Sequence, residues 1–203
     1  MKNLIGIFVI ILIFGLGCSS NKKNNQIENQ TSGILIDSTQ IRKQLRFEKF
    51  LNKLPKYKLP IEIHCGFDSL ESLNDFKDYM DYIPKSMEEI YGLVETDRPQ
   101  YLVLYGRVGD VLYPFLYSYD KNGEIVDSLY LIITSCSIAD ETIIPNSYAI
   151  IDNTLQIIMT DTSKFIHYLD NENYVIDSTL ITNIMTMIQE NGHFQEIKKE
   201  IKQ

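Results

Sequence analysis

The sequence lacks the motifs from which an activity is usually read. HExxH, GxSxG, the P-loop and the glycine fingerprint of dinucleotide-binding proteins are all missing. Their absence lowers the expectation of an enzyme, although catalytic residues can also come together from distant parts of a chain. Basic residues are in the minority as well, with 19 Lys and Arg against 27 Asp and Glu. Because the phosphates of nucleic acids demand basic surfaces, we do not expect a nucleic-acid partner.

Long apolar runs are scarce, and the only one extends from Leu4 to Leu16. It is too short for a comfortable membrane span, which needs about 20 apolar residues. Lys2 precedes the run, and small residues and a cysteine close it, which is the layout of a secretory signal. The junction Gly17-Cys18 resembles that of bacterial lipoprotein signals. The resemblance implies cleavage before Cys18, attachment of lipids to that cysteine and anchoring in a membrane.

Three segments are therefore expected along the chain: a signal peptide over residues 1–17, the lipidated Cys18 with a disordered tether to residue 33, and one domain over residues 34–203. The tether has almost no apolar side chains and cannot form a core. Removing the signal from 203 residues leaves 186, with a net charge of −9, because the signal contains one Lys and no acid. We expect a protein of the cell envelope, held at the outer membrane by its acyl chains rather than by attraction to anionic headgroups.

Cysteine is rare in the rest of the chain, where only Cys65 and Cys136 follow Cys18. In an exported protein these two can form a disulfide that persists. Such a bridge would close a loop of about 70 residues and contribute about 4 kcal/mol in the chain-entropy description. Two buried free thiols are the alternative, since unpaired cysteine is among the most buried residue types. Both alternatives stay open, because the sequence cannot settle the connectivity.

Helices are expected at the start of the domain and strands after them. Apolar residues recur at helical spacing over 38–54, where Pro55 ends the helix, and again over 68–83 and 85–91. A short strand is expected over 59–65. Further strands are expected over 100–107, 111–120, 123–135, 147–151, 154–161, 164–169, 174–182 and 184–198, the last with a hairpin. A helix over 178–190 is the alternative for part of this stretch.

Turn signals connect these strands. Asn122-Gly123 predicts a two-residue type I′ turn. Asp152-Asn153 and Asn191-Gly192 predict turns of the same type. Short strands joined by hairpin turns form an antiparallel meander. The fold class expected from the sequence is α+β, with N-terminal helices packed on a curved antiparallel β-meander that forms an open barrel or a single twisted sheet.

The turn at Asn122-Gly123 also predicts which residues face each other across the hairpin. The expected pairs are Tyr119–Val126, Tyr117–Ser128, Phe115–Tyr130 and Tyr113–Ile132. One face of the hairpin then carries Tyr113, Phe115, Tyr117, Tyr119 and Tyr130. Burial of this face in the core is the favoured interpretation, because strands commonly bury such rings. The alternative is an exposed ligand face for a sugar or a protein, formed by Tyr113, Tyr117, Tyr119 and Tyr130.

No metal and no other cofactor are expected. Residues 120–124 begin like a calcium loop but lack its later acidic ligands, and a hairpin turn explains them better. The acidic residues Glu71, Asp75 and Asp78 are interpreted as a solvated helix face. Metal-ligand spacing is also missing around the histidines, which are His64, His167 and His193.

The order of these features resembles that of small lipoproteins of the Bacteroidetes. Their lipobox, polar tether and short helices are followed by a Leu-Pro motif, here Leu54-Pro55 or Leu59-Pro60, and by a hairpin with the pattern Tyr-Asp-x-x-Gly-x-x-x-Asp, here within Tyr119 to Leu129. The resemblance implies lipid anchoring and a β-rich domain and assigns no catalytic residue. We expect a lipid-anchored module that binds an envelope protein or glycan without chemistry of its own. The alternatives are an envelope hydrolase with a site assembled from scattered residues, and a structural or inhibitory lipoprotein.

Overall fold

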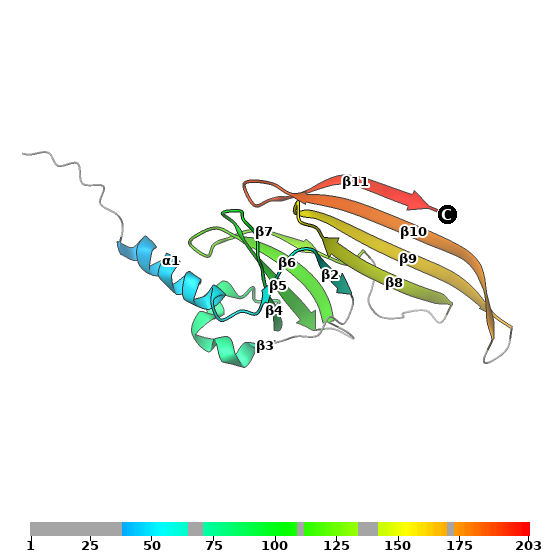
Figure 1. Ribbon diagram of the computed structural model, residues 1–203. Coiled ribbons are helices and arrows are strands. Elements are labelled where there is room, and N and C mark those ends of the chain that lie inside the picture. The colour runs from blue at the N-terminus through cyan, green and yellow to red at the C-terminus, as the bar shows by residue number, and fades with distance from the viewer. Residues whose placement is uncertain (1–37, 65–70, 109–111, 134–141, 170–172) are drawn as a thin grey trace, which may run out of the picture. The chain divides into compact units, whose positions relative to one another are not determined.

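The computed structural model describes residues 38–64, 71–108, 112–133, 142–169 and 173–203, all within one compact unit, Ile36–Gln203. Its helices are the α-helix α1 (Ser38–Leu51) and the 3-10 helix η1 (Leu73–Tyr82). The strands are β1 (Lys56–Tyr57), β2 (Ile61–His64), β3 (Glu71–Ser72), β4 (Glu89–Val94), β5 (Tyr101–Val108), β6 (Leu112–Tyr119), β7 (Ile125–Tyr130), β8 (Ile143–Ile151), β9 (Gln156–Tyr168), β10 (Tyr174–Ile188) and β11 (Phe194–Lys202) (Figure 1). The predicted signal, tether, Cys18, Cys65 and Cys136 lie outside the described residues.

The strands form two sheets rather than the single meander expected from the sequence. One has the order β1-β4-β5-β6-β7, with β3 also on β4, and the other has the order β11-β10-β9-β8-β2. Neighbouring strands are antiparallel except β1 and β4, which are parallel. The chain changes sheets between Tyr57 and Ile61. Residues 102–106 of β5 are all buried, so both faces of the first sheet need cover, and a single sheet cannot supply it.

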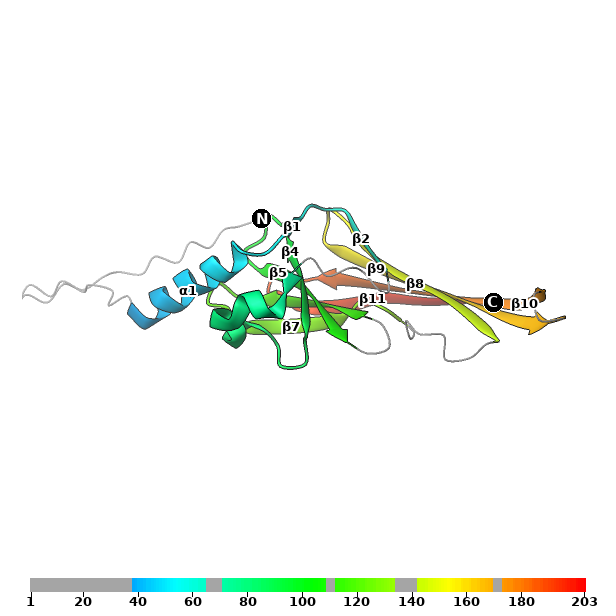
Figure 2. The same cartoon turned by 90° about the horizontal axis from the view of Figure 1, so that it is seen from below.

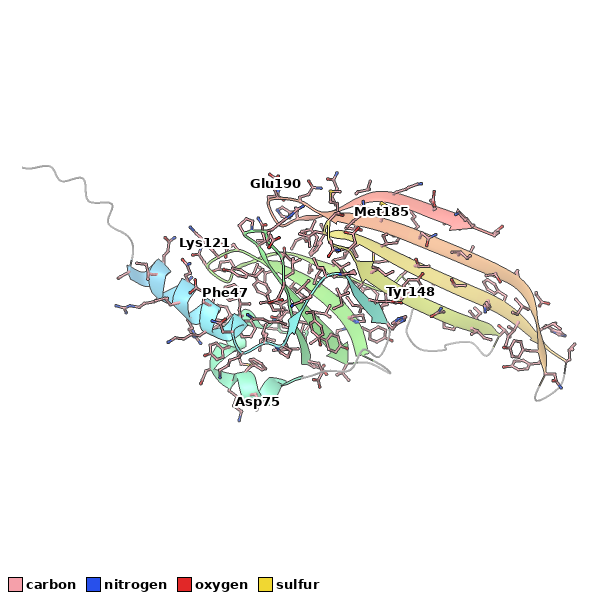
Figure 3. All side chains as sticks on the ribbon, in the orientation of Figure 1. Phe47, Asp75, Lys121, Tyr148, Met185 and Glu190 are labelled. Atoms are coloured by element: carbon pink, nitrogen blue, oxygen red, sulfur yellow. The ribbon has the colours of Figure 1, made fainter. Side chains whose placement is uncertain are left out.

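Two apolar clusters cover the two faces of the first sheet. The cluster between the sheets joins Leu104 and Leu116 to Ile63 and Ile157 of the second sheet. The other cluster gathers aromatic side chains from α1, η1 and the opposite face of β5 and β6, among them Phe47 (labelled in Figure 3). Alternate residues of one strand point to opposite faces, so Leu104 and Val103 belong to different clusters.

The segment predicted as a helix over 85–91 is instead the loop before β4 and the first half of that strand. Ile90 and Tyr91 are fully buried, and β4 pairs with β5 on one side. On the other side Leu93 N–H donates to the carbonyl of Pro55 at 2.8 Å. A Cβ at Gly92, whose φ is 149°, would collide with that carbonyl, so only glycine allows β1 to approach. Pairing with distant strands therefore overrides the weak helical pattern.

The alternative of a helix over 178–190 is wrong, because β10 runs as one strand from Tyr174 to Ile188. It pairs with β9 on one side and with β11 on the other. The two strands predicted over 154–161 and 164–169 are one strand, β9. The helix predicted over 68–83 is a 3-10 helix that begins at Leu73.

The hairpin between β6 and β7 keeps the predicted register although its turn is of another type. Gly123 N–H donates to the Asp120 carbonyl at 3.1 Å, and Gly123 alone in this turn has positive φ, at 82°. This is a type I turn with a glycine bulge, not a type I′ turn. This turn shifts the strand pairing next to it by one residue, so Tyr119 faces Ile125 and not the predicted Val126. An irregularity between Ser118 and Tyr119 then restores the predicted pairing for the rest of the hairpin. The pairs Phe115–Tyr130 and Tyr117–Ser128 are confirmed as a result. The remaining predicted pair, Tyr113–Ile132, lies beyond the end of β7.

Candidate functional site

The structure divides the predicted tyrosine face into a buried end and a half-exposed end. At the buried end, the Tyr119 hydroxyl donates to the Tyr82 carbonyl at 2.7 Å and lies 2.9 Å from the Tyr105 hydroxyl. Burial raises the pKa of both hydroxyls, well above the usual value for Tyr105. Neither ring is exposed, so this end of the face belongs to the core and offers no ligand surface.

At the other end of that face, three half-buried rings form a small aromatic cluster. The Phe115 and Tyr130 ring centroids are 4.9 Å apart, and those of Tyr113 and Tyr130 are 6.2 Å apart. The Arg107 guanidinium lies 5.6 Å from the Phe115 centroid. Burial is the main cause that raises the pKa of Tyr130 to about 12. Tyr117 is also half-buried, and its ring meets Tyr105 edge-on. Of the four candidate ligand residues, Tyr113, Tyr117 and Tyr130 thus keep partial access to solvent.

A groove that the sequence does not predict opens where the edges of the two sheets meet. β7 ends one sheet order and β11 ends the other, so within the described residues neither strand pairs on its outer side. We call the region between β7 and β11, both labelled in Figure 2, the seam. The seam holds a groove of about 460 Å³, which lies within the size range of ligand sites. Its lining consists of Asp127, Ser128, Leu129, Tyr130, Ile132, Ile133, Met159, Ile184, Thr186, Phe194, Glu196 and Lys199.

The floor of the seam groove is apolar, and most of it, including Met159, belongs to the cluster between the sheets. Met159 is 4% exposed and Ile132 is 2% exposed, so the floor is closed beneath the groove. Leu129, Ile184 and Phe194 are partly buried and pack against the same cluster. The groove therefore gives an apolar ligand access to the edge of a core that is already formed.

One carboxylate closes the seam at the turn end of the groove. Asp127 Oδ1 accepts from Ser128 N–H of β7 at 2.8 Å, and Oδ2 accepts from Phe194 N–H of β11 at 3.0 Å. The His193 ring nitrogen Nδ1 lies 3.3 Å from Oδ2. Partial desolvation raises the pKa of Asp127, but these hydrogen bonds outweigh it and hold the pKa below its usual value. Asp127 thus joins the edges of both sheets, and we call this contact the Asp127 clasp.

Replacing Asp127 with asparagine is expected to lower the free energy of unfolding at pH 7 by about 1 kcal/mol, because one edge N–H loses its charged acceptor. The folded state lowers the pKa of Asp127, so this stabilisation is complete above pH 4 and is lost as the pH falls through the folded pKa. The difference between wild type and variant should therefore shrink at pH 3. Urea unfolding at the two pH values measures it, with Asp97→Asn, an exposed carboxyl, as the control. A difference that stays the same at both pH values would contradict the clasp.

The most buried polar cluster lies on β8, β9 and β10. Asp161 is 1% exposed and accepts from Ser147 Oγ at 2.5 Å and from Ser163 Oγ at 3.0 Å, while Thr182 faces it across the strand pair. Hydrolysis by an activated serine also needs a base such as histidine. The described histidines lie elsewhere: His64 meets Glu62, His193 meets Asp127, and His167 is exposed opposite Val175. The Asp161 cluster is therefore a buried hydrogen-bond network, and none of the histidine contacts above reaches it.

A second depression, of about 830 Å³, lies among the loops at residues 58–59, 95–98 and 153–155. Its rim is polar, and Arg98 Nη1 is already engaged with the Ile188 carbonyl at 2.7 Å. Unlike the seam groove, it is lined by loop residues, of which only Leu59 and Leu155 are apolar. We therefore regard the seam groove as the better candidate site.

Comparisons with known proteins add no functional assignment. No protein family, curated protein or solved structure matches the chain. Within the described ranges, no three His, Cys, Asp or Glu side chains come close enough together to hold a metal ion. No helix in that part of the chain has the length and apolar character needed to cross a membrane. The case for a function rests on the sequence of the N-terminus and on the geometry of the seam.

Proposed function

We propose that this protein is a lipid-anchored binding module of the cell envelope, which holds an apolar ligand or partner segment in the seam groove and has no chemistry of its own. The observation that carries the proposal is an apolar groove between two sheet edges that lack strand partners in the described part of the chain. Gly17-Cys18 after a short apolar run supports the lipid anchor, and Ser19 after the cysteine supports the outer membrane. In this proposal α1 and η1 cover the outer face of the first sheet and leave the seam as the accessible side.

Binding of an apolar fluorescent probe tests whether the seam groove accepts ligands. Anilinonaphthalene sulfonate should bind the Cys18→Ser chain saturably at one site, with its apolar rings over Ile184 and its sulfonate near Lys199. Ile184→Lys, which places a charge on the groove floor, should weaken binding about tenfold or more.

Met185→Lys is the matched control, because the next residue of a strand faces away from the groove (Figure 3 labels Met185 on β10). Thermal unfolding of both variants shows whether they fold. Lys199→Glu provides a rim variant that leaves the apolar floor intact. Equal weakening of dye binding by Ile184→Lys and Met185→Lys would contradict a binding site at the seam. So would a lack of saturable binding to the Cys18→Ser chain without these substitutions.

A further inference from the structure

The two halves of α1 differ in how far the rest of the domain covers them. In the second half, Phe47, Phe50 and Leu51 are buried in the aromatic cluster between α1 and the first sheet. In the first half, every residue from 38 to 43 is exposed, and Figure 1 shows this end of the helix extending past the sheet. Because a helix of this length gains most of its stability from the packing of a face, the first half of α1 stands to gain from a further partner.

Two large apolar side chains of α1 lie on the side of the helix that faces away from the aromatic cluster. Ile41 is 42% exposed and Leu45 is 53% exposed, and their spacing of four makes them neighbours on one side of the helix. At 3.6 residues per turn, Leu45 lies about 160° around the helix axis from Phe47. Arg42 precedes Leu45 by three positions and Lys49 follows it by four, so both bases flank the apolar pair.

The charge of α1 is opposite in sign to that of the chain. Residues 38–51 contain four basic residues and one acid, a net charge of +3, whereas the whole chain has a net charge of −8. Lys43 and Arg46 form ion pairs within the domain. Arg42 and Lys49 are exposed and form no ion pair with any described residue. The two bases beside the exposed apolar pair are therefore available to a negatively charged partner.

The place of α1 in the chain favours a membrane as that partner. Ser38, the first residue of α1, follows Cys18, the expected site of lipid attachment, by 20 positions. A flexible chain of that length has a mean end-to-end distance of about 25 Å, so a bilayer that holds the acyl chains would remain within reach of α1. Exposed apolar side chains flanked by bases are typical of helices that lie on anionic membrane surfaces.

We propose that the first half of α1 docks on an anionic membrane surface, where Ile41 and Leu45 enter the headgroup region and Arg42 and Lys49 contact lipid phosphates. This contact adds to the acyl chains and orients the domain, because the strongly acidic remainder of the chain is repelled by the same surface. The inference rests on the lipid anchor of the proposed function to place a bilayer near α1, and it concerns a surface other than the seam.

The fluorescence of a single tryptophan tests the inference, because the chain contains no tryptophan of its own. Leu45→Trp is introduced into residues 18–203 with Cys18→Ser, a form that lacks the expected signal and acyl chains but contains the whole compact unit. With vesicles of equal parts phosphatidylcholine and phosphatidylglycerol, its emission should shift saturably to shorter wavelength, and with phosphatidylcholine alone it should not. Lys164→Trp on β9 is the matched control and should show no shift.

Removing the two flanking bases tests the role of charge. Arg42→Gln combined with Lys49→Gln should weaken vesicle binding of the Leu45→Trp form about tenfold or more, since each base near an anionic surface contributes about fivefold. Lys85→Gln combined with Lys164→Gln removes the same charge from exposed positions elsewhere and should leave binding unchanged. Circular dichroism shows whether each variant folds.

Four outcomes overturn docking by α1: no shift with either kind of vesicle, equal shifts with both, an equal shift for Lys164→Trp, or equal weakening by the two double substitutions. A shift with soluble polyglutamate but not with vesicles also overturns it, in favour of an acidic protein as the partner. Failure of α1 to bind vesicles is distinguishable from failure of the proposed anchor, because mass spectrometry of the wild-type N-terminus detects acylation of Cys18 independently.

Discussion

Replacing Phe47 with alanine is expected to lower the free energy of unfolding by about 3–5 kcal/mol. The Phe47 side chain is fully buried, and its ring centroid lies 5.0 Å from that of Tyr82, 5.4 Å from that of Tyr119 and 5.5 Å from that of Tyr101. These rings come from η1, β6 and β5, so the substitution opens a cavity where three elements meet α1. Urea unfolding followed by circular dichroism measures the loss.

Leu45→Ala is the matched control for Phe47→Ala, because Leu45 lies on the same helix and is 53% exposed. Its substitution should change the free energy of unfolding by no more than about 0.5 kcal/mol. Similar losses for the two variants would show that α1 is not packed on the first sheet. The pair therefore also tests the helix packing that the α+β description requires.

Replacing Cys18 with serine is expected to move the exported protein from the detergent phase to the aqueous phase, or to leave it as an uncleaved precursor. Acyl chains contribute about 0.8 kcal/mol to the free energy of membrane binding for each buried methylene group. The expected mature net charge of −9 offers little attraction to anionic headgroups. Phase partition and mass spectrometry of the N-terminus measure the change.

Cys65→Ser controls for the loss of a thiol elsewhere in the chain and should leave the partition unchanged. Wild-type protein whose N-terminal mass lacks acyl chains would contradict the anchor, and so would a Cys18→Ser variant that is cleaved and still stays in the detergent phase. A lower melting temperature for Cys65→Ser, equal to that of Cys136→Ser, would favour the disulfide over two buried free thiols.

Local patterns along the sequence were enough to predict α1 and most of the hairpins. Helical spacing of apolar residues and Pro55 predict a helix over 38–54, and α1 spans Ser38–Leu51. Asn122-Gly123, Asp152-Asn153 and Asn191-Gly192 all lie in turns that connect strands. Each is a type I turn followed by a residue with positive φ, namely Gly123, Leu155 or Gly192, and not the predicted type I′ turn. Such features depend on residues within a few positions of one another, so the sequence displays their cause directly. The lipoprotein signal is also a local pattern, and it stays a prediction.

The candidate site was not predictable because it depends on which distant strands become neighbours. β4 pairs with β1 and β5, and that pairing turned a weak helical pattern into a buried strand. The seam arises only because β7 and β11 end separate sheets. Leu129, Ile184 and Phe194 look like ordinary strand residues in the sequence, and nothing local shows that they border one groove. The sequence by itself therefore determined the helix, the positions of the turns and the β-rich character, each of which depends on short-range spacing. The tertiary structure decided the split into two sheets and the seam, because burial of both faces of β5 required a second sheet whose last strand does not pair with β7.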